Sequence, residues 1–322
     1  MLVDPDVTML EGPSSRRTKE IAVKLFTQVA AAVSLLVTVA IVGTLFYRAI
    51  DFVITLAAPS DADIENAGAP LGLDLLWSND QWAPRFNRFD IKTLIVGSLI
   101  VTTIAMLVAG PLGLGAAIYL SEYASAKYRR ILKPILEILA GIPSIVIAFF
   151  ALRFIAPKIV QPIFDTASQS LLAAGLGVGL LTIPLVASIS EDALRSVPNS
   201  LREASAGMGA RKMRTTLTVV TPAAVSGLVA AGIVGISRAI GETMVVFLVA
   251  GGGGNSALFT ANPLEKGSTM TAAMASQASG SDNIISDVAE NSLYFVGAVL
   301  FLTTFLLNIL ADRVVRRFRE RY

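Results

Sequence analysis

The sequence SEDALRSVPNSLREASAGMGARKMRTTLTVVTP, from Ser190 to Pro222, is a polar interruption in a chain that is otherwise rich in apolar residues. Within it, Ser200 and Glu203 have the S-x-x-E spacing of a capping box, in which the two side chains bond the first free backbone N–H groups of a helix. This spacing predicts a short helix that begins at Leu201.

Two glycines, Gly207 and Gly209, end the predicted helix, because glycine takes the left-handed conformation of a helix C-cap without steric cost. Arg211, Lys212 and Arg214 follow directly, before a new apolar run begins. The stretch therefore predicts a short helix between two apolar segments, edged with positive charge. Such a helix offers a surface that a soluble partner can bind.

The spacing of this stretch resembles the EAA loop of ABC-importer permeases, which has E-A-A, a glycine four positions on and I-x-L-P after nine more residues. The matching positions are Glu203, Ala204, Ser205, Gly209, Val219, Thr221 and Pro222. Serine, valine and threonine replace an alanine, an isoleucine and a leucine of the motif, roughly keeping size or shape. In that family the loop forms a coupling helix that docks into a groove of the ATPase subunit. The resemblance implies that role for Ser200, Glu203, Ala204, Ser205 and Gly209; the alternative is an ordinary cytoplasmic helix-turn-helix loop.

The composition is that of a polytopic, all-α membrane protein. The chain has 322 residues, of which 54% are hydrophobic, and a mean hydropathy of +0.67. It contains no cysteine and no histidine. This excludes disulfides, thiolate chemistry, the usual zinc sites and any Ser-His-Asp or Cys-His catalytic arrangement.

Six apolar runs are long enough to be transmembrane helices, which need about 20 residues to cross roughly 30 Å of hydrocarbon. They are residues 25–50, 94–120, 135–155, 171–189, 217–250 and 292–310. The predicted organisation is a cytoplasmic tail (1–24), a first transmembrane helix (25–50), an external loop (51–92), a permease core (93–312) containing the loop 190–215, and a basic cytoplasmic tail (313–322). The external loop holds both tryptophans, Trp77 and Trp82, which we expect at the membrane interface.

Three features predict irregular or close packing within these runs. The sequence Gly110-Pro111-Leu112-Gly113 should kink the second span, and Gly141-Ile142-Pro143-Ser144 should disturb the third, which we expect to end in a loop at 157–169. Gly175, Gly177 and Gly179 give the fourth span a small-residue face that allows another helix to approach closely.

The distribution of basic residues predicts the orientation in the membrane. Of the 26 lysines and arginines, 18 lie in the amino-terminal tail, the 121–134 turn, the 190–215 loop and the carboxyl-terminal tail. Five lie in the loops on the opposite side, and three lie in or at the ends of spans. Both termini and the 190–215 loop are therefore predicted to be cytoplasmic.

An arginine and a glutamate lie inside the fifth predicted span. Arg238 and Glu242 are at positions i and i+4, so we expect them on one helix face and close enough to pair. An arginine at the centre of a lone span costs about 2.5–3.5 kcal/mol on insertion scales, which a simple membrane anchor would avoid. Arg238 could face an interior path and attract an anion, because its planar donor fork suits phosphate oxygens. The alternative is a structural ion pair that locks this helix to a neighbour.

The surrounding sequence SRAIGETM, residues 237–244, is similar to a segment of the phosphate-importer permeases of the Pst system. The stretch Ile183–Ser190 looks more like the PstC-type than the PstA-type permease. This resemblance implies a type I ABC-importer (MetI-like) permease fold in a bacterial cytoplasmic membrane. It also implies a second homologous permease, two ATPase subunits inside and a phosphate-binding protein outside. The chain itself would hold no cofactor, since ATP and Mg²⁺ would bind to the ATPase.

Other functions remain as alternatives. The transported anion could be sulfate or molybdate, and the chain could be a secondary transporter or channel that works alone. A membrane enzyme such as a lipid transferase would need a cluster of catalytic groups, and only scattered carboxylates are present.

Weaker candidate residues have simpler explanations. Gly251–Gly254 has no following Gly-Lys-Ser/Thr and is not a P-loop, so ATP must be hydrolysed by a separate chain. Glu137 and Arg153 are expected to be interfacial anchors. The carboxyl-terminal arginines would fix the topology and attract anionic membrane lipid rather than nucleic acid.

Overall fold

The computed structural model describes residues 14–68, 70–78, 80–251, 257–280 and 286–318, and it divides into two units, 1–48 and 49–322. The first unit contains most of helix α1 (Ser14–Ala57), a single helix whose apolar stretch is long enough to cross a membrane. The predicted tail at 1–24 is helical from Ser14, and its residues 1–13 lie outside the described residues.

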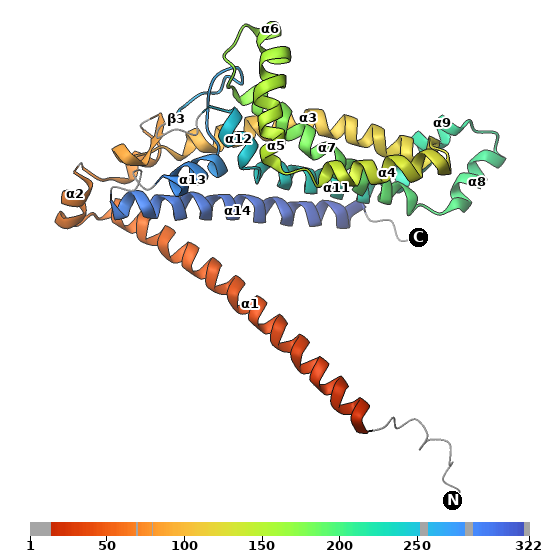
Figure 1. Cartoon of the computed structure of the whole chain (residues 1–322), viewed down its shortest axis with the longest axis horizontal. Helices are drawn as coiled ribbons and strands as arrows, with labels where there is room; N and C mark the ends of the chain where they lie inside the picture. Colours follow the sequence, from red (N-terminus) through yellow and green to blue (C-terminus); the bar gives the residue numbers. More distant parts are fainter. Residues whose placement is uncertain (1–13, 69, 79, 252–256, 281–285, 319–322) are drawn as a thin grey trace, which may run out of the picture. The chain divides into compact units, whose positions relative to one another are not determined.

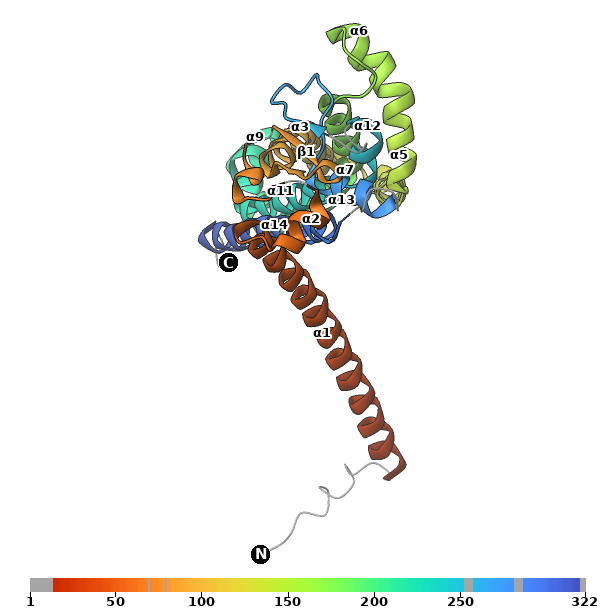
Figure 2. The same ribbon diagram turned by 90° about the vertical axis from the view of Figure 1, so that its left-hand side faces the viewer.

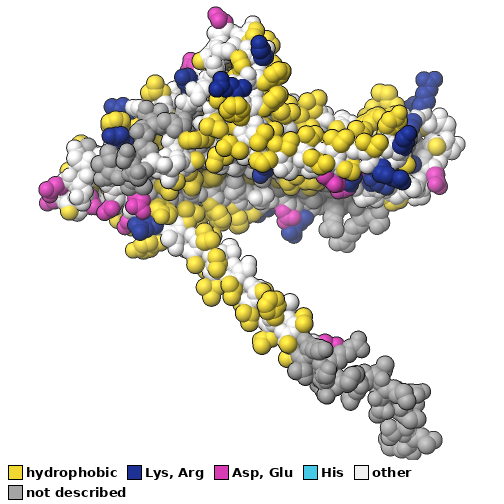
Figure 3. All heavy atoms as spheres, viewed as in Figure 1, with side chains coloured by type: hydrophobic (Ala, Val, Ile, Leu, Met, Phe, Trp, Pro, Cys, Tyr) yellow, Lys and Arg dark blue, Asp and Glu magenta, His cyan; other side chains and the backbone are white. Residues whose placement is uncertain are grey.

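Four long helices of the second unit pack side by side: α3 (Ile91–Ile118), α7 (Leu171–Arg195), α11 (Val225–Ile240) and α14 (Asp287–Phe318) (Figure 1). The core between α3, α7 and their neighbours consists mainly of alanine, valine and leucine. Basic side chains gather at the end of this unit that carries the short helices α8 and α9, and apolar side chains cover much of its middle (Figure 3).

The close approach predicted for α7 is confirmed, but its three glycines do not share one face: Gly175 and Gly179 face α3, and Gly177 faces Ala151 and Val245. A Cβ added to Gly175 would lie 2.7 Å from Cβ of Ile104 on α3, and one added to Gly177 would lie 2.9 Å from Cβ of Ala151. Both distances are shorter than any tolerated contact, so only glycine permits this approach. These glycines bring α7 against neighbours on two sides, which makes it the central helix of the unit.

The third predicted span, 135–155, has the wrong bounds. Helix α4 (Ala126–Ala140) ends at the predicted irregularity, and α5 (Ser144–Phe150) begins after it. The chain then stays helical through a π-helical segment η5 (Ala151–Val160) and α6 (Gln161–Phe164), forming an arm that leaves the bundle (Figures 1 and 2). Most of the predicted loop at 157–169 is thus helical, because Ile155, Ala156 and Val160 are buried around Pro157 and hold the helix together.

The fifth predicted span, 217–250, is also not one helix. The segments Lys212–Ala223 and Val225–Ile240 meet at an angle of 73°. The first contains α9 (Lys212–Thr215), η6 (Thr216–Val220) and α10 (Thr221–Ala223), and α12 (Met244–Val249) follows α11 after a break at Gly241. Pro222 and Gly241 lie at these two interruptions, and both residue types weaken a helix. Among the described residues, five helices are long and apolar enough to span a membrane, or six if the bent pair counts as one span.

The second span is a more regular helix than the sequence predicts. Helix α3 continues through Pro111 and is extended by a π-helical turn η4 (Tyr119–Tyr123). The sixth span lies within α14, which extends to Phe318 and so includes the first part of the predicted basic tail; residues 319–322 lie outside the described residues.

The segment predicted as an external loop is a folded lobe with a small sheet, which the all-α expectation did not include. It contains α2 (Asp61–Ala67), η2 (Leu73–Leu76), β1 (Gln81–Ala83), η3 (Pro84–Phe86) and β2 (Arg88–Phe89). Strand β1 pairs antiparallel with β2 and with β3 (Ala257–Leu258), and α13 (Met270–Ser279) follows. Trp82 is buried against Phe89, so its predicted interfacial position is wrong, whereas Trp77 is exposed. Of the four glycines at 251–254, only Gly251 lies within the described residues.

Candidate functional site

The short helix predicted in the 190–215 loop exists as α8 (Asn199–Gly207). It begins two residues before the predicted start, and Pro198 occupies the capping position without a side-chain hydrogen bond. The predicted capping box of Ser200 and Glu203 is therefore absent, because Ser200 already lies within the first helical turn. Proline at this position fixes the backbone angle that leads into a helix and so replaces the capping side chain.

The candidate residues of α8 differ in exposure. Ser200, Glu203, Ala204 and Gly209 are exposed and can contact a partner. Ser205 is buried, and its hydroxyl lies 2.8 Å from the hydroxyl of Thr215 on α9. Ser205 thus holds α8 against the next helix and does not lie on the exposed face.

The turn after α8 depends on Gly209, whose φ angle of +79° is in the left-handed region. Its N–H donates to the carbonyl of Ala206, and the next N–H, of Ala210, donates to the carbonyl of Ser205. The turn presents Met208, which is 86% exposed, and Met213 is also exposed nearby. Flexible methionine side chains adapt well to a partner surface, and sequence reasoning did not identify these two.

Arg202 fastens α8 to the rest of the protein. Its guanidinium donates to both carboxylate oxygens of Glu122, at 2.9 and 3.4 Å, and the side chain of Glu122 is only 7% exposed. It also donates to the carbonyls of Leu194, at 2.9 Å, and Val197, at 2.6 Å, at the end of α7. The helix is therefore held in a fixed position while its other face is free.

A second charged cluster surrounds Glu191, near the same end of α7. This carboxylate is buried and lies 2.7 Å from Arg129 and 3.2 Å from Lys133, both on α4; Arg195 is 3.9 Å away. Lys133 also pairs with Asp192 at 3.0 Å, and this hydrogen bond raises the pKa of the Lys133 ammonium group above its usual value. The cluster ties α4 to α7 by opposite charges.

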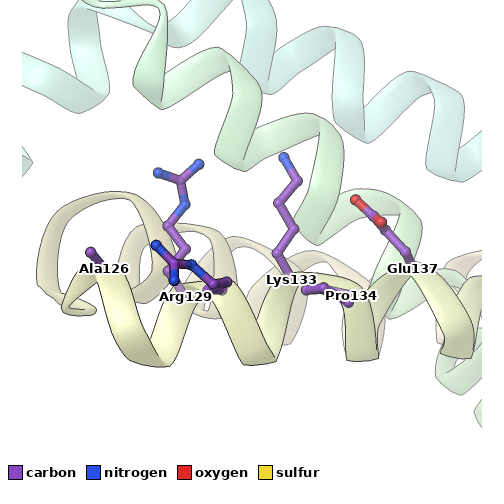
Figure 4. A pocket seen from close by; sticks show the side chains of 6 residues that line it. Ala126, Arg129, Lys133, Pro134 and Glu137 are labelled. Carbon is purple, nitrogen blue, oxygen red and sulfur yellow. The ribbon is translucent and has the colours of Figure 1, made fainter.

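Arg129 and Lys133 project from α4 toward the neighbouring helix in the close-up view (Figure 4). An open hollow of about 370 Å³ runs along this face of α4 and is lined by Ala126, Arg129, Arg130, Lys133, Pro134 and Glu137. Glu137 lines this hollow and is exposed. Its predicted role as an interfacial anchor stays a prediction.

Replacing Glu191 with alanine is expected to destabilise the protein by about 1–3 kcal/mol, because the partly buried cations of Arg129 and Lys133 would lose their shared counter-ion and only Lys133 would keep another one, Asp192. Thermal unfolding of the purified protein in detergent measures this loss. The control is Asp312→Ala, which removes an exposed i,i+4 partner of Arg316 and should change stability by at most about 1 kcal/mol. Equal melting temperatures for the two variants would contradict the structural role of Glu191.

Arg238 and Glu242 lie close together, as predicted, but they do not share a face of one continuous helix. Helix α11 ends at Ile240, so Arg238 is in its last turn and Glu242 follows the break at Gly241. The guanidinium and the carboxylate are 3.9 Å apart, and the side chain of Arg238 is 50% exposed whereas that of Glu242 is 5% exposed. The Glu242 carboxylate also accepts a hydrogen bond from the N–H of Val245, and its backbone carbonyl accepts one from Thr271.

The two residues differ in burial and in their contacts. Glu242 is fixed by neighbouring segments and provides a buried negative charge. Arg238 is held on one side by that charge and keeps donors free on its exposed side. An arrangement of this kind can bind an anion while it avoids an unpaired buried carboxylate.

The chain from residue 109 to residue 322 matches the model of a protein family described as "Binding-protein-dependent transport system inner membrane component". It is similar to the probable ABC transporter permease protein YqgH of Bacillus subtilis (strain 168), with 34% identity over 223 residues, which cover 69% of this chain and 71% of that protein. The phosphate transport system permease protein PstC of Mesorhizobium japonicum is 31% identical over 263 residues, which cover 76% of this chain and 79% of that protein. A probable phosphate transport system permease protein PstC of Methanocaldococcus jannaschii is 28% identical over 299 residues, which cover 87% of this chain and 91% of that protein.

Two solved structures have a similar fold. A chain of the inward-facing MetNI methionine ABC transporter matches with a TM-score of 0.54 and 22% identity, covering 71% of this chain and 97% of that one. A chain of a bacterial ABC transporter involved in import of the acidic polysaccharide alginate matches with a TM-score of 0.61 and 13% identity, covering 95% of this chain and 100% of that one. At these identities the likeness concerns the fold alone, and it confirms the fold expected from the sequence.

Proposed function

The chain belongs to the family of binding-protein-dependent transport system inner membrane components, and from this premise we propose that it is the PstC-type permease subunit of an ATP-driven importer of inorganic phosphate. It is a transport component of the inner membrane and crosses the bilayer several times. Its family name implies a substrate-binding protein, and its ABC-transporter relatives imply an ATPase partner. Phosphate is favoured over sulfate or molybdate because several relatives are named phosphate permeases.

The observation that carries the proposal is the position of α8. Its inner face is anchored through Arg202 and Ser205, and its outer face presents Glu203, Ala204 and the turn at Gly209. A helix that is rigidly attached and yet exposed can transmit force from a partner without unfolding. We therefore assign this face to contact with the ATPase.

The complete transporter would contain a second homologous permease, two ATPase subunits that bind ATP and Mg²⁺, and an external phosphate-binding protein. Both termini and α8 would face the cytoplasm, in agreement with the excess of basic residues there. Arg238 would contact phosphate on the path between the two permeases, and Glu242 would hold Arg238 in place. The carboxyl-terminal arginines would contact anionic membrane lipid.

The test combines co-purification with transport. The chain is purified from native membranes to identify the subunits that accompany it, and the complex is then reconstituted into vesicles with ATP inside and labelled phosphate outside, together with the co-purified binding protein. Phosphate uptake that requires ATP supports the proposal. Uptake by this chain without an ATPase would indicate a secondary transporter, and ATP-dependent uptake of sulfate or molybdate in place of phosphate would identify another oxyanion.

A further inference from the structure

Arg202 joins the turn after α3, which lies 80 positions earlier in the sequence, to the end of α7, which directly precedes its own helix. One guanidinium bonds Glu122 in the turn after α3, the carbonyl of Leu194 in the last turn of α7, and the carbonyl of Val197 just beyond it. Arg202 itself lies on α8. The three segments therefore meet at a single side chain.

The chemistry of this junction requires arginine. The last carbonyls of a helix have no partner within the helix, and they attract positive charge. The planar fork of a guanidinium can bond these carbonyls and a carboxylate together, whereas a lysine ammonium is a compact point charge. Glu122 is almost fully buried, so its negative charge depends on Arg202 for compensation.

The backbone connects α8 directly to α7 and α11 but not to α3, so the Arg202 junction is what links α8 to α3. Helix α8 follows α7 in the chain and leads through α9, η6 and α10 to α11, so movement of α8 reaches both of these long helices through the backbone. Helix α3 has no such connection, because its end at Tyr123 is separated from α8 by α4 to α7. Among the described residues, the Glu122–Arg202 pair is the ion pair that joins α8 to the end of α3.

A neighbouring contact also joins this region to the end of α3. The ammonium of Lys212 on α9 lies 5.2 Å from the centre of the Tyr123 ring, next to Glu122. Ser205 and Thr215 bond α8 to α9. The end of α3 is thus held from α8 and from α9, and of the two contacts that reach it the Arg202–Glu122 pair is the shorter and the more buried.

We propose that Glu122 and Arg202 are positioning residues that make the end of α3 follow α8 when an attached ATPase subunit moves it. This proposal rests on the proposed function of the chain as an importer permease. Neither residue needs to touch the substrate or the ATPase. Their task is to convert movement of a surface helix into movement of a membrane-spanning helix that is not connected to it by adjacent backbone.

The experiment measures phosphate uptake and ATP hydrolysis in the same vesicles, with the complete importer carrying Arg202→Lys or Glu122→Gln. Arg202→Lys keeps the positive charge but loses the fork, and Glu122→Gln removes only the negative charge. For both variants we expect at least a tenfold fall in phosphate transported per ATP hydrolysed, with hydrolysis within twofold of the unmodified complex. The control is Arg316→Lys, which changes an exposed arginine paired with Asp312 and should leave the ratio unchanged.

The possible outcomes separate this inference from the proposed function. A parallel fall in uptake and hydrolysis, loss of the assembled complex in both variants, or an unchanged ratio would each overturn the positioning role. If only Arg202→Lys fails to assemble, Glu122→Gln decides, since it leaves the bonds from Arg202 to the α7 carbonyls in place. Absence of phosphate uptake by the unmodified complex would instead reject the proposed function on which the inference rests.

Discussion

Replacing Arg238 with alanine is expected to reduce phosphate uptake by roughly ten- to a hundredfold while the complex still assembles. The guanidinium is half exposed and has donors that Glu242 does not occupy, so it can contact a passing anion. A hydrogen bond to a charged group contributes about 1.5–3 kcal/mol, and about 1.4 kcal/mol corresponds to a factor of ten. Uptake of labelled phosphate into reconstituted vesicles, with subunit content checked on the same preparation, measures the effect.

The matched control for this experiment is Arg153→Ala. Arg153 is also an arginine of an apolar helical segment, but it stacks on the ring of Phe149 at 5.5 Å and was predicted to be an interfacial anchor. Its replacement should lower uptake less than twofold. Normal uptake by the Arg238 variant would place Arg238 off the path and favour a purely structural ion pair with Glu242.

The sequence predicts those parts of the fold that depend on local patterns. The length of the apolar runs reveals five or six spans, because the thickness of the bilayer sets that length regardless of tertiary contacts. The close packing of α7 is visible because repeated glycines have few other uses in an apolar helix. The Gly-Ile-Pro break at 141–143 is likewise found where the sequence places it.

The remaining features depend on contacts between distant residues. Arg202 and Glu122 are 80 positions apart, and Glu191 is about 60 positions from Arg129 and Lys133, so no spacing rule relates them. The local sequence gives one indication of these ion pairs. Glu122 and Glu191 each lie near the end of an apolar run, where a carboxylate needs a partner. Ser205 illustrates the same limit, because a motif position on a short helix does not reveal which face is buried.

The break after α11 shows how one residue changes an interpretation. Spacing at i and i+4 places Arg238 and Glu242 on one helix face only if the helix continues through both, and Gly241 interrupts it. The two residues nevertheless remain 3.9 Å apart, since the N–H groups of Gly241 and Glu242 still donate to the carbonyls of Ser237 and Ala239 in the last helical turn. The predicted proximity is thus confirmed, but its geometric reason is wrong.

Replacing Gly209 with valine is expected to reduce ATP-driven phosphate uptake at least tenfold and to weaken retention of the ATPase during purification. A β-branched residue at a φ of +79° is strained by about 1–3 kcal/mol, so the turn after α8 should rearrange and displace Met208 and the end of the helix. Gly209 has no atom within 4 Å of an added Cβ, so the effect would come from backbone strain and not from a clash within the chain.

Gly207→Ala is the control that isolates this strain. Gly207 is the last residue of α8, and an added Cβ there also meets no atom within 4 Å, but its backbone is helical. Alanine should leave uptake and ATPase retention unchanged and favour the helix by about 0.5–1 kcal/mol. If Gly209→Val retained the ATPase and transported phosphate as well as Gly207→Ala does, the turn would not be part of the docking surface, and α8 would have to contact its partner through the Glu203 and Ala204 face alone.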